Sequence, residues 1–257
     1  MNELDMDEAH QAEFGVIAGW TAELLVDREP AAVLAGACRG SGSPAVLAWL
    51  AESLCLTQGT RLLDIGAGLG GALSWAEQHY GIDPVAVEPM AQAAAGSTRL
   101  FGLTSVSASA LALPLRDASA DVAWFLGVLD TLDDPLAALR EARRVLRVDG
   151  RVGVLAYLAD GPIDPAKAPR GNRFQSAAEL DHTLDNAGFV VIDRLIGQPL
   201  PEAPVEWQLR QARLQTELEE RHRHDPRWID AIEQERRLAT LLDSGAVCFG
   251  LIHAICV

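Results

Sequence analysis

The sequence predicts an α/β protein with a Rossmann-like, mostly parallel seven-stranded sheet and helices on both faces. Short apolar runs rich in β-branched residues alternate with helical patterns through the middle of the chain, as in consecutive βαβ units. Several runs are apolar at successive positions, which is typical of parallel strands buried on both faces. The first run ends in a glycine-rich turn, RLLDIGAGLGG at residues 61–71, which leads directly into a helical pattern.

Helical segments precede this first strand and form an expected amino-terminal extension, residues 1–56. Apolar residues between Phe14 and Leu25 recur at helical spacing, so an amphipathic helix is expected there. After a glycine-serine break, Ser43 and Pro44 are the residue types of an N-cap and a first helical position. A further helix therefore leads towards the sheet.

A core, residues 57–198, follows the extension. Its clearest expected strands are the apolar runs at residues 61–65, 85–88, 121–126, 151–157 and 189–195, and a less clearly marked strand is expected at 104–107. Residues 199–243 contain two amphipathic helical patterns, near 205–223 and 227–242, and are interpreted as a helical insertion. Residues 244–257 are expected to supply the last core strand.

The composition excludes several classes of partner. The formal net charge of −15 opposes the phosphate attraction on which nucleic-acid binders depend, so no nucleic-acid partner is expected. The first eight residues are acidic, the wrong sign for a signal peptide, and the apolar tail is too short to span a bilayer. We therefore expect a cytoplasmic protein with no membrane partner. The four cysteines form no C-x-x-C pair, so no metal site is expected.

The glycine-rich turn indicates a nucleotide-type ligand. Glycines allow a sharp turn and a close approach of the backbone, and the following helix presents unpaired N–H groups. The spacing of Gly66, Gly68 and Gly71, with Glu88 downstream, also satisfies the dinucleotide pattern G-x-G-x-x-G. A nicotinamide-dependent oxidoreductase is therefore one alternative.

Four separated motifs favour a different cofactor. Asp64 lies inside the first strand, and VAVEPM at residues 85–90 ends the second. An LP pair, then DVAWFL and finally LREARRVLRVDG at residues 139–150, follow in order. From about residue 57 to 195 the chain resembles the class I S-adenosylmethionine-dependent methyltransferases. The resemblance implies that family's fold, S-adenosyl-L-methionine as cofactor, and methyl transfer to an oxygen, nitrogen or carbon atom.

The resemblance also implies where the cofactor binds. Glu88 is expected to accept hydrogen bonds from both ribose hydroxyls, and Asp64 either to orient the turn or to hold the cofactor's ammonium group. Where related enzymes usually have Asp-Ala near adenine, this chain has Ser109 and Ala110; the serine hydroxyl accepts but carries no charge. The expected cofactor-binding residues are Asp64, Gly66, Ala67, Gly68, Glu88, Pro89, Met90, Ser109, Ala110, Leu126 and Arg39. 

Arg39 is included on chemical grounds, because a guanidinium suits the cofactor's carboxylate; a solvated loop arginine is the alternative. No catalytic base stands out, and the candidates are Asp130, His222 and His224. The sulfonium is already reactive, so alignment and desolvation are the main tasks of such an enzyme.

The acidic composition and the absence of nucleic-acid methylation motifs favour a small-molecule acceptor. A non-catalytic protein that binds S-adenosylmethionine for a partner is the second alternative. Both helical additions are too short to stand alone, so we expect them to cover the acceptor site. Packing on a sheet edge would instead build a homodimer.

Overall fold

The computed structural model describes residues 3–257, and side-chain surroundings from Phe14 onward. The acidic residues 1–8, on which the expectation of no signal peptide rests, are outside the range whose side chains are described. The described helices are α1 (Glu3–Leu25), α2 (Pro30–Ala37), α3 (Pro44–Ser53), α4 (Gly71–Tyr80), α5 (Ala91–Phe101), α6 (Pro135–Val145), α7 (Ala177–Asn186), α8 (Val205–His222) and α9 (Pro226–Asp243). None of these helices is both long enough and apolar enough to cross a membrane.

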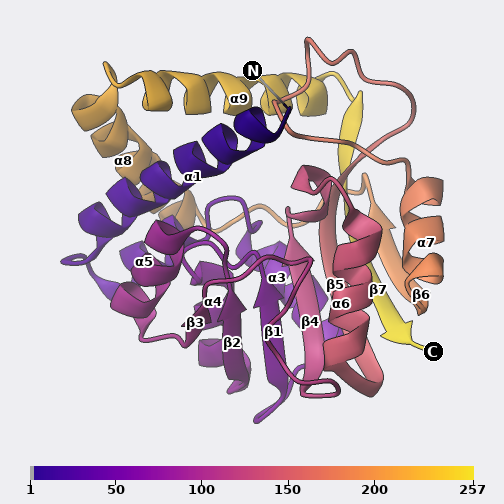
Figure 1. Ribbon diagram of the computed structural model, residues 1–257. Coiled ribbons are helices and arrows are strands. Elements are labelled where there is room, and N and C mark those ends of the chain that lie inside the picture. Colours follow the sequence, from indigo (N-terminus) through magenta and orange to yellow (C-terminus); the bar gives the residue numbers. More distant parts are fainter. Residues whose placement is uncertain (1–2) are drawn as a thin grey trace.

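Seven strands form one sheet: β1 (Arg61–Ile65), β2 (Asp83–Val87), β3 (Ser105–Val106), β4 (Ala120–Leu126), β5 (Leu146–Ala159), β6 (Phe189–Ile196) and β7 (Val247–Cys256). Their order is β3-β2-β1-β4-β5-β7-β6. The first five pair in parallel, whereas β7 runs antiparallel between β5 and β6. The predicted mostly parallel, seven-stranded Rossmann-like sheet is confirmed (Figure 1).

Both faces of the sheet are covered by helices, as the apolar strands predicted. On one face, Leu62 and Trp124 pack with the apolar residues of α3 and α4. On the other face, Leu63 and Phe125 pack with α6 and α7. Local sequence starts these helices: Ser43 Oγ accepts the Val46 N–H at the first turn of α3.

Among the strands, the largest difference from the expected boundaries is at the start of β5. The resemblance of the motif at residues 139–150 implies a turn before the fifth strand, but β5 begins at Leu146 rather than at the expected Arg151. Asp149 adopts a φ of +60°, and the pairing register with β4 shifts between Ala120 and Val122. The bulge takes up the extra residues, so the strand continues through a segment where the family motif predicts a turn.

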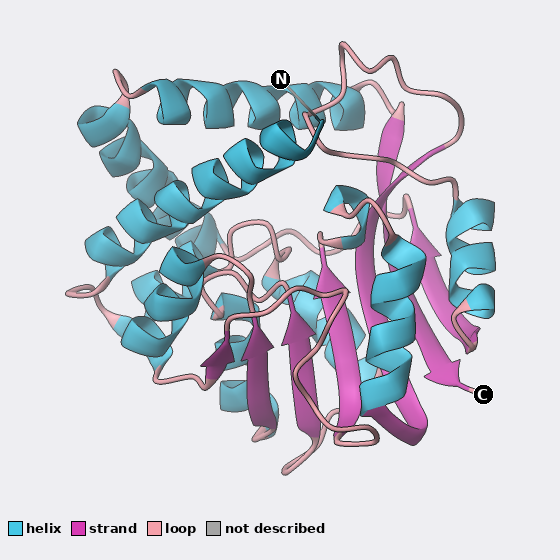
Figure 2. Cartoon of the chain, viewed as in Figure 1, coloured by secondary structure: helices cyan, strands magenta, loops and turns pink. Residues whose placement is uncertain are grey.

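The helical additions gather at the carboxyl end of the sheet. Figure 1 shows α1 and α9 crossing above the arrowhead ends of β1, β2 and β4, and Figure 2 shows this helical layer above the strands. Ile17 and Leu24 of α1 form a buried cluster with Leu218 of α8 and Trp228 of α9. Ion pairs between Arg28 and Glu217, and between Arg210 and Glu29, also join the extension to the insertion. The two additions are therefore packed on each other above the strand ends.

Candidate cofactor and acceptor site

The end of β2 is tied directly to the glycine turn after β1. Glu88 Oε2 accepts the Gly68 N–H at 2.7 Å, and Oε1 accepts the Met90 N–H at 2.9 Å. Gly68 has a φ of +54°, which a residue with a Cβ rarely adopts. Each carboxylate oxygen still has a lone pair for a ligand hydroxyl. Burial raises the pKa of Glu88, and the two N–H groups oppose part of that rise.

The amino-terminal helix covers this corner of the molecule. A Cβ on Gly15 of α1 would lie 2.7 Å from Gln92 Oε1 and 3.6 Å from Met90 Cβ. Helix α1 therefore approaches the segment that follows Glu88 closely, and the Glu88 side chain is buried. A ligand held by Glu88 would lie beneath α1.

Asp64 and Trp124 are neighbouring polar side chains buried in the sheet, and the indole lies close enough to favour the charged carboxylate. They are register neighbours on β1 and β4, and Asp64 Oδ1 and Trp124 Nε1 are both buried without a hydrogen-bond partner. Burial raises the pKa of Asp64 to about 7; the Trp124 indole opposes part of this rise, and Glu88 adds to it. A buried acceptor without a partner costs free energy unless a ligand supplies a donor. The carboxylate of Asp64 is therefore suited to a cationic group of a ligand.

Arg39 lies in the loop between α2 and α3, across the ends of β1 and β4. A Cβ on Gly71 would lie 2.6 Å from Cys38 N, and one on Gly127 would lie 3.0 Å from Gly40 O. The loop is therefore held against the segments that follow both strands. Arg39 Nη2 forms an ion pair with Glu235 of α9, while Nη1 is buried without a partner. Arg39, which is predicted to contact the cofactor's carboxylate, thus lies close to the glycine turn, and its Nη1 is left to donate a hydrogen bond.

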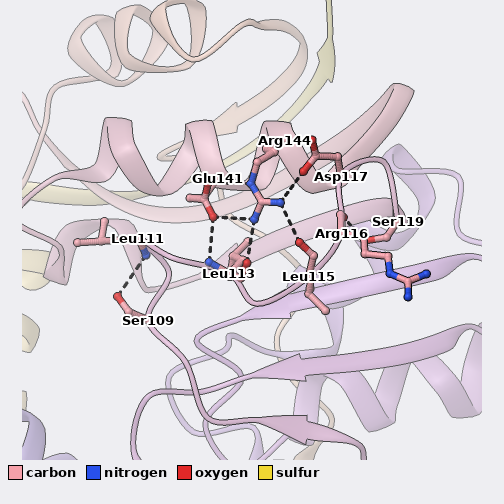
Figure 3. Close-up of polar contacts among 9 residues, drawn as sticks. All are labelled: Ser109, Leu111, Leu113, Leu115, Arg116, Asp117, Ser119, Glu141 and Arg144. Atoms are coloured by element: carbon pink, nitrogen blue, oxygen red, sulfur yellow. Dashed lines mark hydrogen bonds and ion pairs between the residues drawn. The ribbon is translucent and has the colours of Figure 1, made fainter.

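The segment that carries Ser109 and Ala110 is held from outside by α6. Ser109 is exposed, and its Oγ accepts the Leu111 N–H at 3.2 Å, closing a short turn, whereas Ala110 is buried. Figure 3 shows Glu141 and Arg144 of α6 pointing to the same loop. Glu141 Oε2 accepts a backbone N–H of this loop at 2.9 Å, and the Arg144 guanidinium donates to two of its carbonyls at 2.8 Å and pairs with one of its aspartates.

Asp130 follows β4 in a short 3-10 helix, η1 (Leu129–Thr131), and connects two strand ends. Its Oδ2 accepts the Tyr157 N–H of β5 at 2.7 Å, and its side chain is buried. Burial raises the pKa of Asp130 to about 7, and the Tyr157 N–H opposes part of the rise. Burial and Asp130 raise the pKa of Tyr157. Asp130 thus lies beside Tyr157 at the carboxyl edge of the sheet, where it stays a candidate proton acceptor.

His222 and His224 are not brought to this edge. His222 stacks on Trp20 of α1 with ring centroids 3.7 Å apart, and Arg227 lies over the same indole. His224 is exposed and lies beside Arg223. Figure 1 shows the α8–α9 turn that carries them at an outer corner of the helical layer, away from the ends of β4 and β5. Packing of α1 against the insertion accounts for the position of His222, and His224 is exposed to solvent, so neither histidine lies at the strand ends.

A cavity of about 490 Å³ lies between the α2–α3 loop and α8. Arg39, Ser43 and Tyr157 line its core side, and Trp207 and Gln211 are among the residues on its insertion side. A second cavity, of about 530 Å³, lies against α7. The first cavity touches the Arg39 loop and the end of β5, so it adjoins the predicted cofactor site. Among the described residues, no group of three or more His, Cys, Asp or Glu side chains is arranged to hold a metal ion.

The sequence did not indicate four residues of this arrangement. The apolar pattern predicts Trp124 and Tyr157 only as strand residues, although each lies at or near the carboxyl end of its strand. Glu141 and Arg144 belong to the helix motif at residues 139–150, which carried the resemblance without suggesting that these side chains hold the neighbouring loop. Leu126 is buried at the end of β4, and its contact with the cofactor stays a prediction.

Part of the chain is similar to known methyltransferases. Residues 63–154 match the family model described as a methyltransferase domain. The O-methyltransferase resE of Aspergillus sclerotiorum is 30% identical over 154 residues, which is 54% of this chain and 58% of that protein. The chain thus aligns with little more than half of that relative's length.

Solved structures show the same fold at low sequence identity. The [4+2]-cyclase SpnF superposes with a TM-score of 0.67 at 22% identity, covering 82% of this chain and 80% of SpnF. The geranyl diphosphate C-methyltransferase of Streptomyces coelicolor A3(2) gives a TM-score of 0.62 at 18% identity, covering 83% and 76%. The family model thus identifies residues 63–154 as a methyltransferase domain, and the solved structures show that its fold extends over more than four fifths of the chain.

Proposed function

We propose that this protein transfers the methyl group of S-adenosylmethionine to a small-molecule acceptor. The observation that carries the proposal is the set of polar groups around the glycine turn. Glu88 presents two oxygens for the ribose hydroxyls, and Asp64 Oδ1 and Arg39 Nη1 are buried without partners. The Asp64 carboxylate suits a ligand's ammonium group, and Arg39 Nη1, on a guanidinium whose Nη2 is paired with Glu235, suits a ligand's carboxylate.

The chain's own residues have defined tasks in this reaction. When bound, the cofactor supplies an electrophilic methyl group. Asp64 and Arg39 would hold the two ends of its amino-acid part, and Glu88 its ribose. Helix α1 and the α8–α9 insertion exclude water above the strand ends, which favours methyl transfer over side reactions. Alignment of an acceptor in the adjacent cavity would supply most of the catalysis.

The test is binding followed by turnover. Calorimetry should detect binding of S-adenosylmethionine and S-adenosylhomocysteine but not of NAD or NADP. Transfer of a labelled methyl group should then be measured across a panel of metabolites. Binding of NAD alone would refute the cofactor assignment. Binding of S-adenosylmethionine without transfer to any compound would favour the non-catalytic alternative.

We further propose that the protein acts in the cytoplasm on a metabolite rather than on nucleic acid. The net charge of −15 supports this choice of acceptor, because a polyanionic substrate would be repelled. The amino-terminal extension and the insertion lie above the strand ends. This position favours a role in covering the site over a role in a homodimer contact. Sedimentation of the purified protein would test whether a homodimer forms.

A further inference from the structure

The cavity beside the cofactor site differs in charge from the rest of the chain. The sequence contains 36 acidic residues, yet no Asp, Glu, His or Lys side chain lines the cavity among the described residues. Its polar lining is neutral apart from Arg39, whose charge is already paired with Glu235. The remainder of the lining is mainly apolar. The cavity is therefore close to uncharged in a strongly acidic protein.

Two lining residues of α8 define what this cavity would bind. Trp207 is partly buried against the core cluster beneath and supplies a flat aromatic surface. Gln211 donates through Nε2 to Ala35 O at 3.0 Å, so its Oε1 is left to accept a hydrogen bond. A volume of about 490 Å³ is in the range of pockets for small organic ligands.

Charge excludes two classes of acceptor. A cationic amine would be desolvated with no anion to pair with and would face the Arg39 guanidinium. A carboxylate would have to compete with Glu235 and with the cofactor's own carboxylate for the same guanidinium. An uncharged compound avoids both costs and needs only neutral hydrogen-bond partners, which Gln211, Ser43 and Tyr157 provide.

We propose that the acceptor is an uncharged, ring-bearing hydroxyl compound bound in the cavity between the α2–α3 loop and α8, with its ring against Trp207. This inference rests on the proposed methyltransferase function. In the reaction, a bond forms between the hydroxyl oxygen and the methyl carbon as the sulfur–methyl bond breaks. The sulfonium becomes a neutral thioether, and the hydroxyl proton is released to solvent.

The test uses three naphthalenes that differ only in their polar group: 2-naphthylmethanol, 2-naphthylmethylamine and 2-naphthoate. Binding of each is measured by calorimetry at pH 7.5 with the full chain saturated with S-adenosylhomocysteine. We expect the alcohol to bind about tenfold or more tightly than the cation or the anion. Equal or tighter binding of the amine or the acid, or no binding of any of the three, would overturn the inference.

Variants locate the binding site. Trp207→Ala should weaken binding of the alcohol about tenfold, whereas Trp207→Phe keeps a ring and should change it less than about threefold. Leu209→Ala, on an exposed part of α8 outside the cavity lining, is the matched control and should have no effect. Equal affinity in all three variants would place the alcohol elsewhere and overturn the inference. Failure of S-adenosylhomocysteine to bind at the first step would instead refute the proposed function.

Discussion

Glu88 and Gly68 are joined by a hydrogen bond of 2.7 Å between a carboxylate at the end of β2 and a backbone N–H in the turn after β1. This bond sets the relative position of the two segments expected to contact the cofactor. It also means that the acid has a structural task, so a variant must be judged by its stability as well as by its binding.

The first prediction concerns Glu88. Glu88→Gln should weaken binding of S-adenosylhomocysteine by roughly 1.5–3 kcal/mol, because the amide accepts with one oxygen only and carries no charge. Calorimetry measures the affinity, and chemical unfolding reports the cost of altering the contacts to Gly68 and Met90. Glu77→Gln, on the exposed side of α4, is the control. Unchanged affinity in Glu88→Gln would show that the ribose lies elsewhere.

Arg39 should recognise only the amino-acid part of the cofactor. Arg39→Gln is expected to weaken the binding of S-adenosylhomocysteine by roughly 1.5–3 kcal/mol, the value of a charge-assisted hydrogen bond. Binding of 5′-methylthioadenosine, which lacks the carboxylate, should not change. Arg28→Gln is a matched control, because Arg28 also pairs with the insertion, through Glu217. Equal losses of affinity for both ligands would show that Arg39 acts by holding α9 in place and not by contacting the carboxylate.

The raised pKa of Asp64 predicts that the stability of the protein depends on pH. Its folded pKa of about 7 lies above the ordinary value of 3.8, so the folded protein binds more protons than the unfolded chain between these values. Wild-type stability should therefore fall as pH rises through this window, by at most about 1.4 kcal/mol per pH unit from this group. Asp64→Asn removes that loss and should gain stability relative to wild type at pH 8 but not at pH 4.

Urea unfolding of both proteins without ligand, at several pH values, measures this difference. Asp130 also has a raised pKa, but it is present in both proteins, so its contribution to the pH dependence cancels in the comparison. A stability difference that stays constant with pH would show that Asp64 is ionised normally. The same variant should bind S-adenosylhomocysteine more weakly than wild type, because an amide cannot pair with the ammonium group.

Ser109 is exposed, so adding a carboxylate there should not bury a charge. Ser109→Asp should keep the turn to Leu111 and preserve or tighten S-adenosylhomocysteine binding, by about 1 kcal/mol at most. Ser107→Asp adds the same charge two residues earlier on an exposed position and should leave affinity unchanged. Loss of both folding and binding in Ser109→Asp would reject the proposed alignment with the adenine contact.

Arg144 should support the adenine segment from a distance. Arg144→Ala removes the bonds to Leu113 and Leu115 and should lower stability by about 1–3 kcal/mol, with weaker S-adenosylhomocysteine binding. Exposed Arg140 on the same helix is the control. Thermal unfolding with and without ligand separates the two effects; a stability loss with unchanged affinity would limit Arg144 to a structural role.

The sequence by itself determined the order of strands and helices, the glycine turn, and the acid at the end of β2. These features are local: apolar runs, capping residues such as Ser43, and a turn that needs glycine at Gly68 each depend on neighbours along the chain. The same local information identified the cofactor family, because its motifs follow strand ends in a constant order. It misplaced the start of β5, since the bulge at Asp149 depends on pairing with β4.

Only the tertiary structure decided which groups meet above the strand ends. The pairing of Arg39 with Glu235, the position of Tyr157 beside Asp130, and the stacking of His222 on Trp20 join segments far apart in the sequence. Such contacts depend on how α1, α8 and α9 pack, and periodicity indicates only that each helix has an apolar face. The uncharged cavity could not be predicted from the composition for the same reason. Net charge counts the acidic residues but does not show which parts of the folded protein lack them.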